Sequence, residues 1–162
     1  MMVSSNKNRG RDMTGKQYGF NTTLLHGIDD ENPYGTTTVP IYQSSAFRQS
    51  DAETLEKIFN NKAMGFSYTR INNPTVEAFE KRVNQLEGGL SSVACSSGKA
   101  ALFNAMMNIL QTGDEIVAAA GLYGGTVELF DDFEGLDIPT KYVLDNDPSN
   151  YEALITDKTK LI

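Results

Sequence analysis

Hydrophobic positions in the second half of the chain follow two alternating periods. Short apolar runs, typical of buried strands, occupy residues 93–95, 115–120 and 139–144, and another begins at Thr159. The segments between these runs have helical patterns, which cover residues 98–110, 123–133 and 148–155. Strands that alternate with helices in this way indicate an α/β fold with a mostly parallel sheet.

A long helix is predicted directly ahead of this region. Asn73 can cap it, Pro74 suits its first position, and Gly88 with Gly89 should end it. Its apolar positions recur at helical spacing, namely at Val76, Phe79, Val83 and Leu86. The sequence therefore predicts an amphipathic helix over this stretch.

Residues 19–50 show no comparable period. Turn-forming residues are scattered around the short apolar run 39–42. This pattern predicts an extended arm that needs a partner surface to fix its conformation. Residues 51–59 follow as a short helix with an apolar stripe.

Charge is distributed unevenly along the 162 residues. The net charge is −7, but residues 1–16 carry +3 and the remaining chain −10. The acidic body argues against a nucleic-acid surface, and the polar, basic residues 1–18 are expected to form a disordered tail. No apolar stretch approaches the ~18 residues that a membrane span requires. The single cysteine, Cys95, fits a reducing compartment, so we expect a cytoplasmic protein. We also expect no metal site.

The first candidate for chemistry is the junction at residues 94–101. An apolar run ends there in Ser96, Ser97 and Gly98, and an Ala-rich helix pattern follows at once. Backbone N–H groups at such a helix start can bind an anion. Ordinary strand-to-helix turn chemistry would also explain the pattern.

Two further segments carry candidate ligands. Tyr68 and Arg70 would point to the same side of an extended segment, where a phenol and a guanidinium can clamp a phosphate. Tyr123 follows the strand 115–120, and a ring at the carboxyl end of a parallel strand can stack on a planar ligand. Alternatively, Arg70 pairs with an acidic neighbour and Tyr68 packs on the body of the protein, while Tyr123 is a surface residue that opens a helix.

Taken in order, segments 65–75, 94–101 and 121–126 resemble the cysteine/methionine-metabolism family of pyridoxal 5′-phosphate (PLP) enzymes. The resemblance extends from about Gly19 to the end of the chain. It implies a type I PLP-dependent transferase (aminotransferase-like) large domain with an extended N-terminal arm. We expect the arm at 19–72, in contact with a neighbouring subunit, and the first, truncated part of the large domain at 73–162.

The resemblance also implies roles for particular residues. The positions that match Tyr68 and Arg70 hold the cofactor phosphate in the neighbouring subunit's site, which implies a dimer, or a dimer of dimers as in the family. Ser97, Gly98 and Lys99 match a second phosphate contact, although Met or Gln is more usual than Lys at position 99. Tyr123 matches the residue that stacks on the pyridine ring and handles protons, and is the expected catalytic residue.

Gly125 bears on the subclass, because Tyr-Gly-Gly-Thr resembles O-acetylhomoserine sulfhydrylases, whereas methionine γ-lyases typically carry Cys there. The implied reaction replaces the γ-acetate of O-acetyl-L-homoserine with sulfide or a thiol. The alternatives are a methionine γ-lyase, a cystathionine γ- or β-lyase, and an inactive fragment. The last arises because the family's Schiff-base Lys and the acidic partner of the pyridine nitrogen are expected beyond residue 162.

Overall fold

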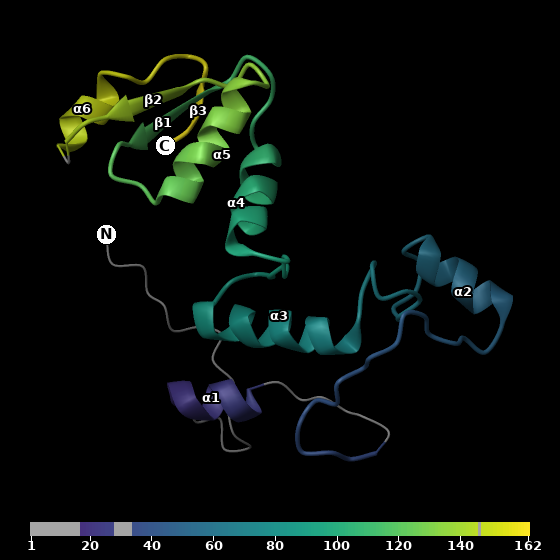
Figure 1. Ribbon diagram of the computed structural model, residues 1–162. Helices are drawn as coiled ribbons and strands as arrows, with labels where there is room; N and C mark the ends of the chain where they lie inside the picture. The colour runs from purple at the N-terminus through teal and green to yellow at the C-terminus, as the bar shows by residue number, and fades with distance from the viewer. Residues whose placement is uncertain (1–16, 28–33, 146) are drawn as a thin grey trace. The chain divides into compact units, whose positions relative to one another are not determined.

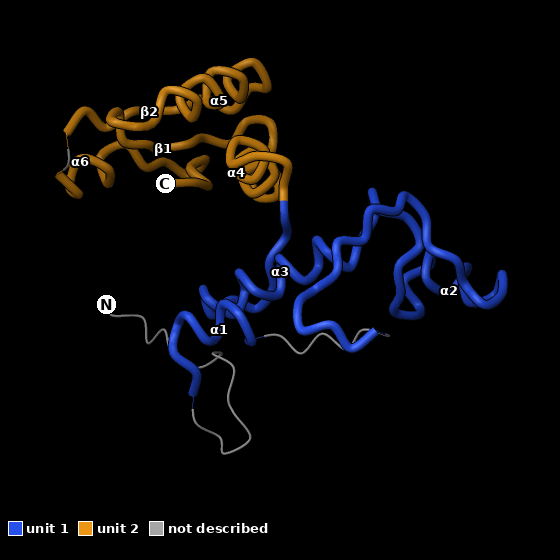
Figure 2. The backbone as a smooth tube through the Cα atoms, turned by 60° about the horizontal axis from the view of Figure 1, so that its bottom comes forward, with its two compact units in different colours: residues 1–94 blue, residues 95–162 orange. Residues whose placement is uncertain are grey.

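The computed structural model describes residues 17–27, 34–145 and 147–162 (Figure 1). Most of the predicted basic tail, residues 1–16, lies outside the described residues. The chain divides into two compact units, Met1–Ala94 and Cys95–Ile162 (Figure 2).

The second unit is built on a three-stranded parallel sheet. Its strands are β1 (Glu115–Ala119), β2 (Thr140–Val143) and β3 (Thr159–Leu161), arranged in the order β2-β1-β3. Central β1 has three consecutive buried residues, as expected for a parallel strand that is covered on both faces. The predicted α/β fold with a parallel sheet is therefore confirmed.

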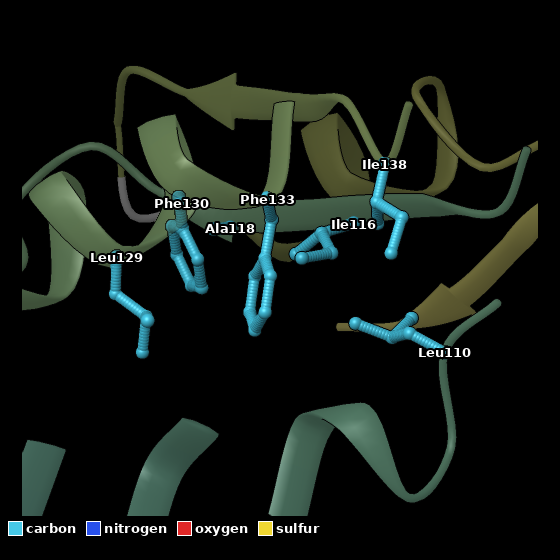
Figure 3. Close-up of a cluster of buried hydrophobic side chains, with 7 residues drawn as sticks. All are labelled: Leu110, Ile116, Ala118, Leu129, Phe130, Phe133 and Ile138. Carbon is cyan, nitrogen blue, oxygen red and sulfur yellow. The ribbon is translucent and has the colours of Figure 1, made fainter. Parts of the chain in front are cut away.

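Three helices accompany this sheet: α4 (Gly98–Met107), α5 (Gly124–Glu134) and α6 (Pro148–Glu152). Phe130 and Phe133 of α5 lie beside Ile116 of β1 in the hydrophobic core (Figure 3). The same cluster contains Leu110, Ala118, Leu129 and Ile138. This core fixes α5 against β1 and so fixes the loop that joins them.

The predicted strand at residues 93–95 is wrong. Residues 91–95 have no regular secondary structure, and the side chain of Val93 is 82% exposed. A strand forms only when another strand pairs with it. Among the described residues, the sheet contains β1 paired with β2 and with β3, and residues 93–95 do not join it. Apolar character alone was not sufficient to predict a strand here. In addition, α4 and α6 end three residues earlier than predicted.

The first unit contains α1 (Phe20–His26), α2 (Ala52–Phe59) and α3 (Pro74–Glu87). The two helices predicted from the sequence, α2 and α3, form within a residue or two of the expected limits. Asn73 caps α3, and Gly88 ends it in the left-handed conformation with φ 67°. The apolar stripe of α3 is only partly covered, because Phe79 is 61% exposed.

Residues 20–26 form α1, where an extended arm was expected. Tertiary contacts explain the helix, because α1 packs on α3. The Arg82 guanidinium donates a hydrogen bond to the Leu24 carbonyl at 2.6 Å, near the negative end of the α1 dipole. Gly27 lies so close to α3 that a Cβ there would stand 2.4 Å from the Gln85 amide oxygen. None of the helices among the described residues has the length and apolar character required to cross a membrane.

Candidate functional site

A cleft of about 580 Å³ lies in the second unit between the first turns of α4 and α5. It is lined by Gly98, Lys99, Ala101, Leu102, Ala105, Tyr123, Gly125 and Thr126. Three of the residues proposed from the sequence, Gly98, Lys99 and Tyr123, therefore face one space. The accessible lining of the cleft is mainly apolar, and the starts of α4 and α5 lie at its border.

Ser97 organises the α4 side of the cleft. Its backbone is extended, and its hydroxyl oxygen accepts a hydrogen bond from the Ala100 N–H at 3.0 Å. The first intrahelical bond runs from Ala101 N–H to the Ser97 carbonyl. The N–H groups of Gly98 and Lys99 come before that bond, so the helix itself gives them no acceptor. A Cβ on Gly98 would meet no atom within 4 Å, so the space beside the Gly98 Cα is open.

Lys99 contributes a positive charge at the rim of the cleft. Its ammonium lies 3.4 Å from the Glu128 carboxylate of α5, and both side chains are largely exposed. An exposed pair of this kind contributes little to stability. Glu128 nevertheless offsets the unfavourable placement of a cation at a helix N-terminus.

Tyr123 forms the α5 side of the cleft. It is the N-cap residue of α5, four residues after the last residue of β1. Its carbonyl oxygen accepts a hydrogen bond from Thr126 N–H at 2.8 Å, which anchors the main chain. Its ring is 83% exposed and is available to a ligand.

Tyr68 and Arg70 lie together in the first unit, but not in the way the sequence suggested. Residues 69–71 form a turn, closed by Ile71 N–H on the Tyr68 carbonyl at 2.8 Å, and not an extended segment. The turn brings the Arg70 guanidinium carbon to 5.4 Å from the centre of the Tyr68 ring, a cation–π contact. The two side chains are neighbours because of the turn and not because of strand alternation.

Asn73 supports this turn in a way that sequence reasoning missed. Its side-chain nitrogen donates to the Thr69 hydroxyl and to the Tyr42 carbonyl, both at 3.0 Å. Its oxygen meanwhile caps α3 by accepting from Thr75 N–H at 2.8 Å. The Asn-Pro signal revealed the cap alone, because Tyr42 is distant in sequence. Thr69 adds a hydrogen bond from its hydroxyl to the Ser44 carbonyl.

The proposed residues thus form two groups in two units. Gly98, Lys99 and Tyr123 line one cleft, which Ser97 borders as the helix cap, and Tyr68 with Arg70 form a separate pair. Across residues 17–27, 34–145 and 147–162, no cluster of three or more His, Cys, Asp or Glu side chains is arranged to hold a metal ion.

Comparisons with known proteins give this geometry a context. The family model described as "Cys/Met metabolism PLP-dependent enzyme" matches residues 21–162. The chain is 39% identical over 141 residues to O-acetyl-L-homoserine sulfhydrylase of Leptospira meyeri, covering 86% of this chain and 32% of the relative. It is also 39% identical over 117 residues to L-methionine gamma-lyase of Fusobacterium nucleatum subsp. polymorphum, covering 72% of this chain and 30% of that enzyme.

A solved structure shares the fold. It is described as an O-acetylhomoserine (thiol)-lyase from Campylobacter jejuni subsp. jejuni with N′-pyridoxyl-lysine-5′-monophosphate. Its TM-score against this chain is 0.81 at 28% identity, over 88% of this chain and 36% of that one. The present chain therefore spans about a third of the length of the proteins it matches.

Proposed function

The chain belongs to the Cys/Met metabolism PLP-dependent enzyme family, and we propose that the complete protein replaces the γ-acetate of O-acetyl-L-homoserine with sulfide or a thiol. PLP supplies the electron-withdrawing ring that such reactions require. The single observation that carries the proposal is the cleft, which Gly98 and Lys99 at the start of α4 line together with the exposed Tyr123. Relatives named as O-acetylhomoserine sulfhydrylases support the choice of substrate.

The residues in the cleft fit the two ends of this cofactor. The N–H groups of Gly98 and Lys99 have no acceptor within α4 and can donate hydrogen bonds to a phosphate. The Tyr123 ring offers a flat apolar surface for a heteroaromatic ring. Its hydroxyl is a group able to accept or donate a proton beside the substrate.

Tyr68 and Arg70 supply a second set of phosphate ligands in this proposal. A guanidinium offers a planar fork of donors, and the cation–π contact with Tyr68 limits the directions in which that fork can point. We propose that this pair serves the site of a neighbouring subunit, so that the active protein is at least a dimer. A cytoplasmic location is part of the same proposal, supported by the single free Cys95.

Substitution of Arg70 tests the phosphate site. In the complete gene product, Arg70→Ala should weaken PLP affinity about ten-fold or more, because a charge-assisted hydrogen bond contributes roughly 1.5–3 kcal/mol. Arg48→Ala is a matched control, because Arg48 is an exposed arginine of the same unit. Spectroscopic titration with PLP measures both affinities. Equal affinities in the two variants would remove Arg70 from the site.

The second candidate function is elimination from methionine, favoured by the 39% identity to a methionine gamma-lyase. The two reactions differ in whether a thiol replaces the leaving group at Cγ or the leaving group is eliminated without replacement. Assays of homocysteine from O-acetylhomoserine and of 2-oxobutyrate from methionine distinguish them. The sulfhydrylase proposal expects homocysteine to dominate, and dominant 2-oxobutyrate would replace it with the lyase.

A further inference from the structure

The turn that carries Tyr68 and Arg70 begins where a short main-chain pairing ends. Tyr68 forms an antiparallel bridge with Ala46, and the Thr69 N–H donates a hydrogen bond to the Ser45 carbonyl at 2.9 Å. The chain turns at residues 69–71, so Arg70 directly follows the last residue that this pairing holds. The direction in which the Arg70 side chain leaves the turn therefore depends on how firmly Thr69 is held.

The Thr69 side chain has hydrogen-bond partners on both sides of the turn. Its hydroxyl donates to the Ser44 carbonyl and accepts from the Asn73 side-chain nitrogen at 3.0 Å. One hydroxyl can do both, because it has one proton and two lone pairs. Asn73 is only 5% exposed, and its nitrogen also donates to the Tyr42 carbonyl at 3.0 Å. We call the two hydrogen bonds of the Thr69 hydroxyl the Thr69 latch.

The Thr69 latch differs from the main-chain pairing because it requires a particular side chain. The N–H of any residue except proline at position 69 can bond the Ser45 carbonyl, whereas the latch needs a hydroxyl. Through it, the residue between Tyr68 and Arg70 is joined to the segment at Ser44 and to the start of α3. Hydrogen bonds are directional, so two of them on one oxygen restrict rotation of the Thr69 side chain and the adjoining turn.

We propose that Thr69 is a positioning residue for phosphate binding, whose hydroxyl holds the turn so that the Arg70 guanidinium stays against the Tyr68 ring. This inference rests on the proposed function, in which Arg70 binds the cofactor phosphate. Thr69 acts through Arg70, whose guanidinium carbon lies 5.4 Å from the ring centre, and does not need to touch the cofactor. A guanidinium that is already held in place loses less conformational freedom when a phosphate binds, which raises the affinity.

Three substitutions isolate the latch. Thr69→Val keeps the branched shape and removes the hydroxyl, whereas Thr69→Ser keeps the hydroxyl. Ser44→Ala is the matched control, because it removes a hydroxyl that donates to the Ala46 carbonyl at 2.7 Å and keeps the carbonyl that the latch uses. In the complete gene product, Thr69→Val should weaken PLP affinity about two- to ten-fold, while Thr69→Ser and Ser44→Ala bind like the wild type. Wild-type affinity in Thr69→Val, or an equal loss in Ser44→Ala, would overturn the proposal.

A double-mutant cycle shows whether the effect passes through Arg70. In an Arg70→Ala background, Thr69→Val should cause no additional loss of PLP affinity, whereas its effect on the urea midpoint of unfolding should persist. An undiminished loss of affinity in that background would overturn the positioning role. Asn73→Ser disrupts the same latch from its other side, because serine keeps the α3 cap and removes the donor to Thr69. It should weaken PLP affinity only when Arg70 is present.

A measurement without cofactor keeps this proposal separate from the proposed function. In NMR spectra of the apo protein, the Arg70 δ-protons should be shifted by the ring current of Tyr68, and Arg70→Ala identifies their signal. The shift should be retained in Thr69→Ser and Ser44→Ala and reduced in Thr69→Val. A wild-type protein that does not bind PLP would refute the proposed function, whereas an unchanged Arg70 shift in Thr69→Val would refute the positioning role.

Discussion

The two units of the molecule are stabilised in different ways. Among the described residues, nine of the eleven buried apolar side chains belong to Cys95–Ile162, and only Ile58 and Ala78 belong to the first unit. Seven of those nine form one continuous cluster around β1 and α5. The second unit therefore has a conventional hydrophobic core, and the described part of the first unit does not.

Directional polar contacts are the main links in the first unit. Asn73 joins α3 to the distant Tyr42 and to the neighbouring turn at Thr69. Thr75 accepts from Tyr42 N–H at 2.8 Å while donating to the Pro40 carbonyl at 3.1 Å. Large apolar side chains stay exposed on its helices, including Phe20, Leu25, Phe79 and Phe59. We therefore expect a cavity-forming substitution to lower the stability of the second unit most. Loss of a side-chain hydrogen bond should instead lower the stability of the first unit most.

The largest effect is expected for Phe133→Ala. Phe133 is fully buried, with 0% exposure, and its ring centre lies 5.6 Å from that of Phe103. Truncation should cost about 3–5 kcal/mol, the usual range for a buried phenylalanine. Urea unfolding followed by circular dichroism measures the loss. Phe79→Ala, on the exposed face of α3, is the matched control, and equal losses would refute the contrast between the units.

Asn73→Ala is expected to have the next largest effect. It removes the α3 cap and both side-chain donor bonds, at a cost of about 1–2 kcal/mol. Asn73→Asp sharpens the test, because it keeps the acceptor for Thr75 N–H and removes only the donors to Tyr42 and Thr69. An intermediate loss is expected for Asp. A loss of zero for both variants would show that these polar contacts do not hold the first unit together.

A smaller effect, which depends on pH, is expected at Glu115. Hydrogen bonds from Lys141 at 2.7 Å and from Thr156 at 2.6 Å lower the pKa of the Glu115 carboxyl below its ordinary value of 4.5. Because the folded-state pKa is the lower one, this carboxylate stabilises the fold at neutral pH. That contribution is lost as the pH falls below 4.5 and through the folded-state pKa.

The test compares Glu115→Gln with the wild-type protein. The variant should be less stable at neutral pH and should lose less of its urea midpoint when the solution is acidified. Glu128→Gln is a matched control in the same unit, because the pair of Glu128 with Lys99 is exposed. Identical acid sensitivity in Glu115→Gln and the wild type would show that the Glu115 hydrogen bonds do not contribute to the stability of the second unit.

The smallest effect is expected for the exposed pair of Glu53 and Lys57 on α2. The two charges lie 2.6 Å apart at i,i+4 spacing, and both side chains are more than half exposed. Their coupling should be about 0.3–0.5 kcal/mol, reduced further by salt. A double-mutant cycle with Glu53→Gln and Lys57→Gln measures it. A coupling as large as the Asn73 effect would show that burial is not what gives the polar contacts of the first unit their strength.

Local signals predicted much of the fold. Asn73, Pro74 and Gly88 marked the limits of α3, and the apolar run 115–120 marked β1 nearly to the residue. A cap, a fixed φ and a period of apolar side chains each depend only on residues that are close together in the sequence. The segment 93–95 was predicted wrongly because its apolar character gives no information about whether a pairing strand is present.

The candidate site shows the same division. Sequence motifs identified Gly98, Lys99 and Tyr123, but only the fold showed that the starts of α4 and α5 border one cleft. Tyr68 and Arg70 were also identified, with the wrong geometry, because a turn and not an extended segment brings them together.

The sequence by itself determined the α/β alternation, the helix caps and the residue types available for binding a phosphate and a planar ring. Those properties follow from short-range sterics, hydrogen-bond capacity and hydrophobic period. Tertiary structure alone decided that residues 20–26 are helical against α3, that Asn73 joins three segments, and that two helix starts converge on one cleft. Each of these depends on contacts between residues far apart in the chain, whose free energy is gained only when the chain has folded.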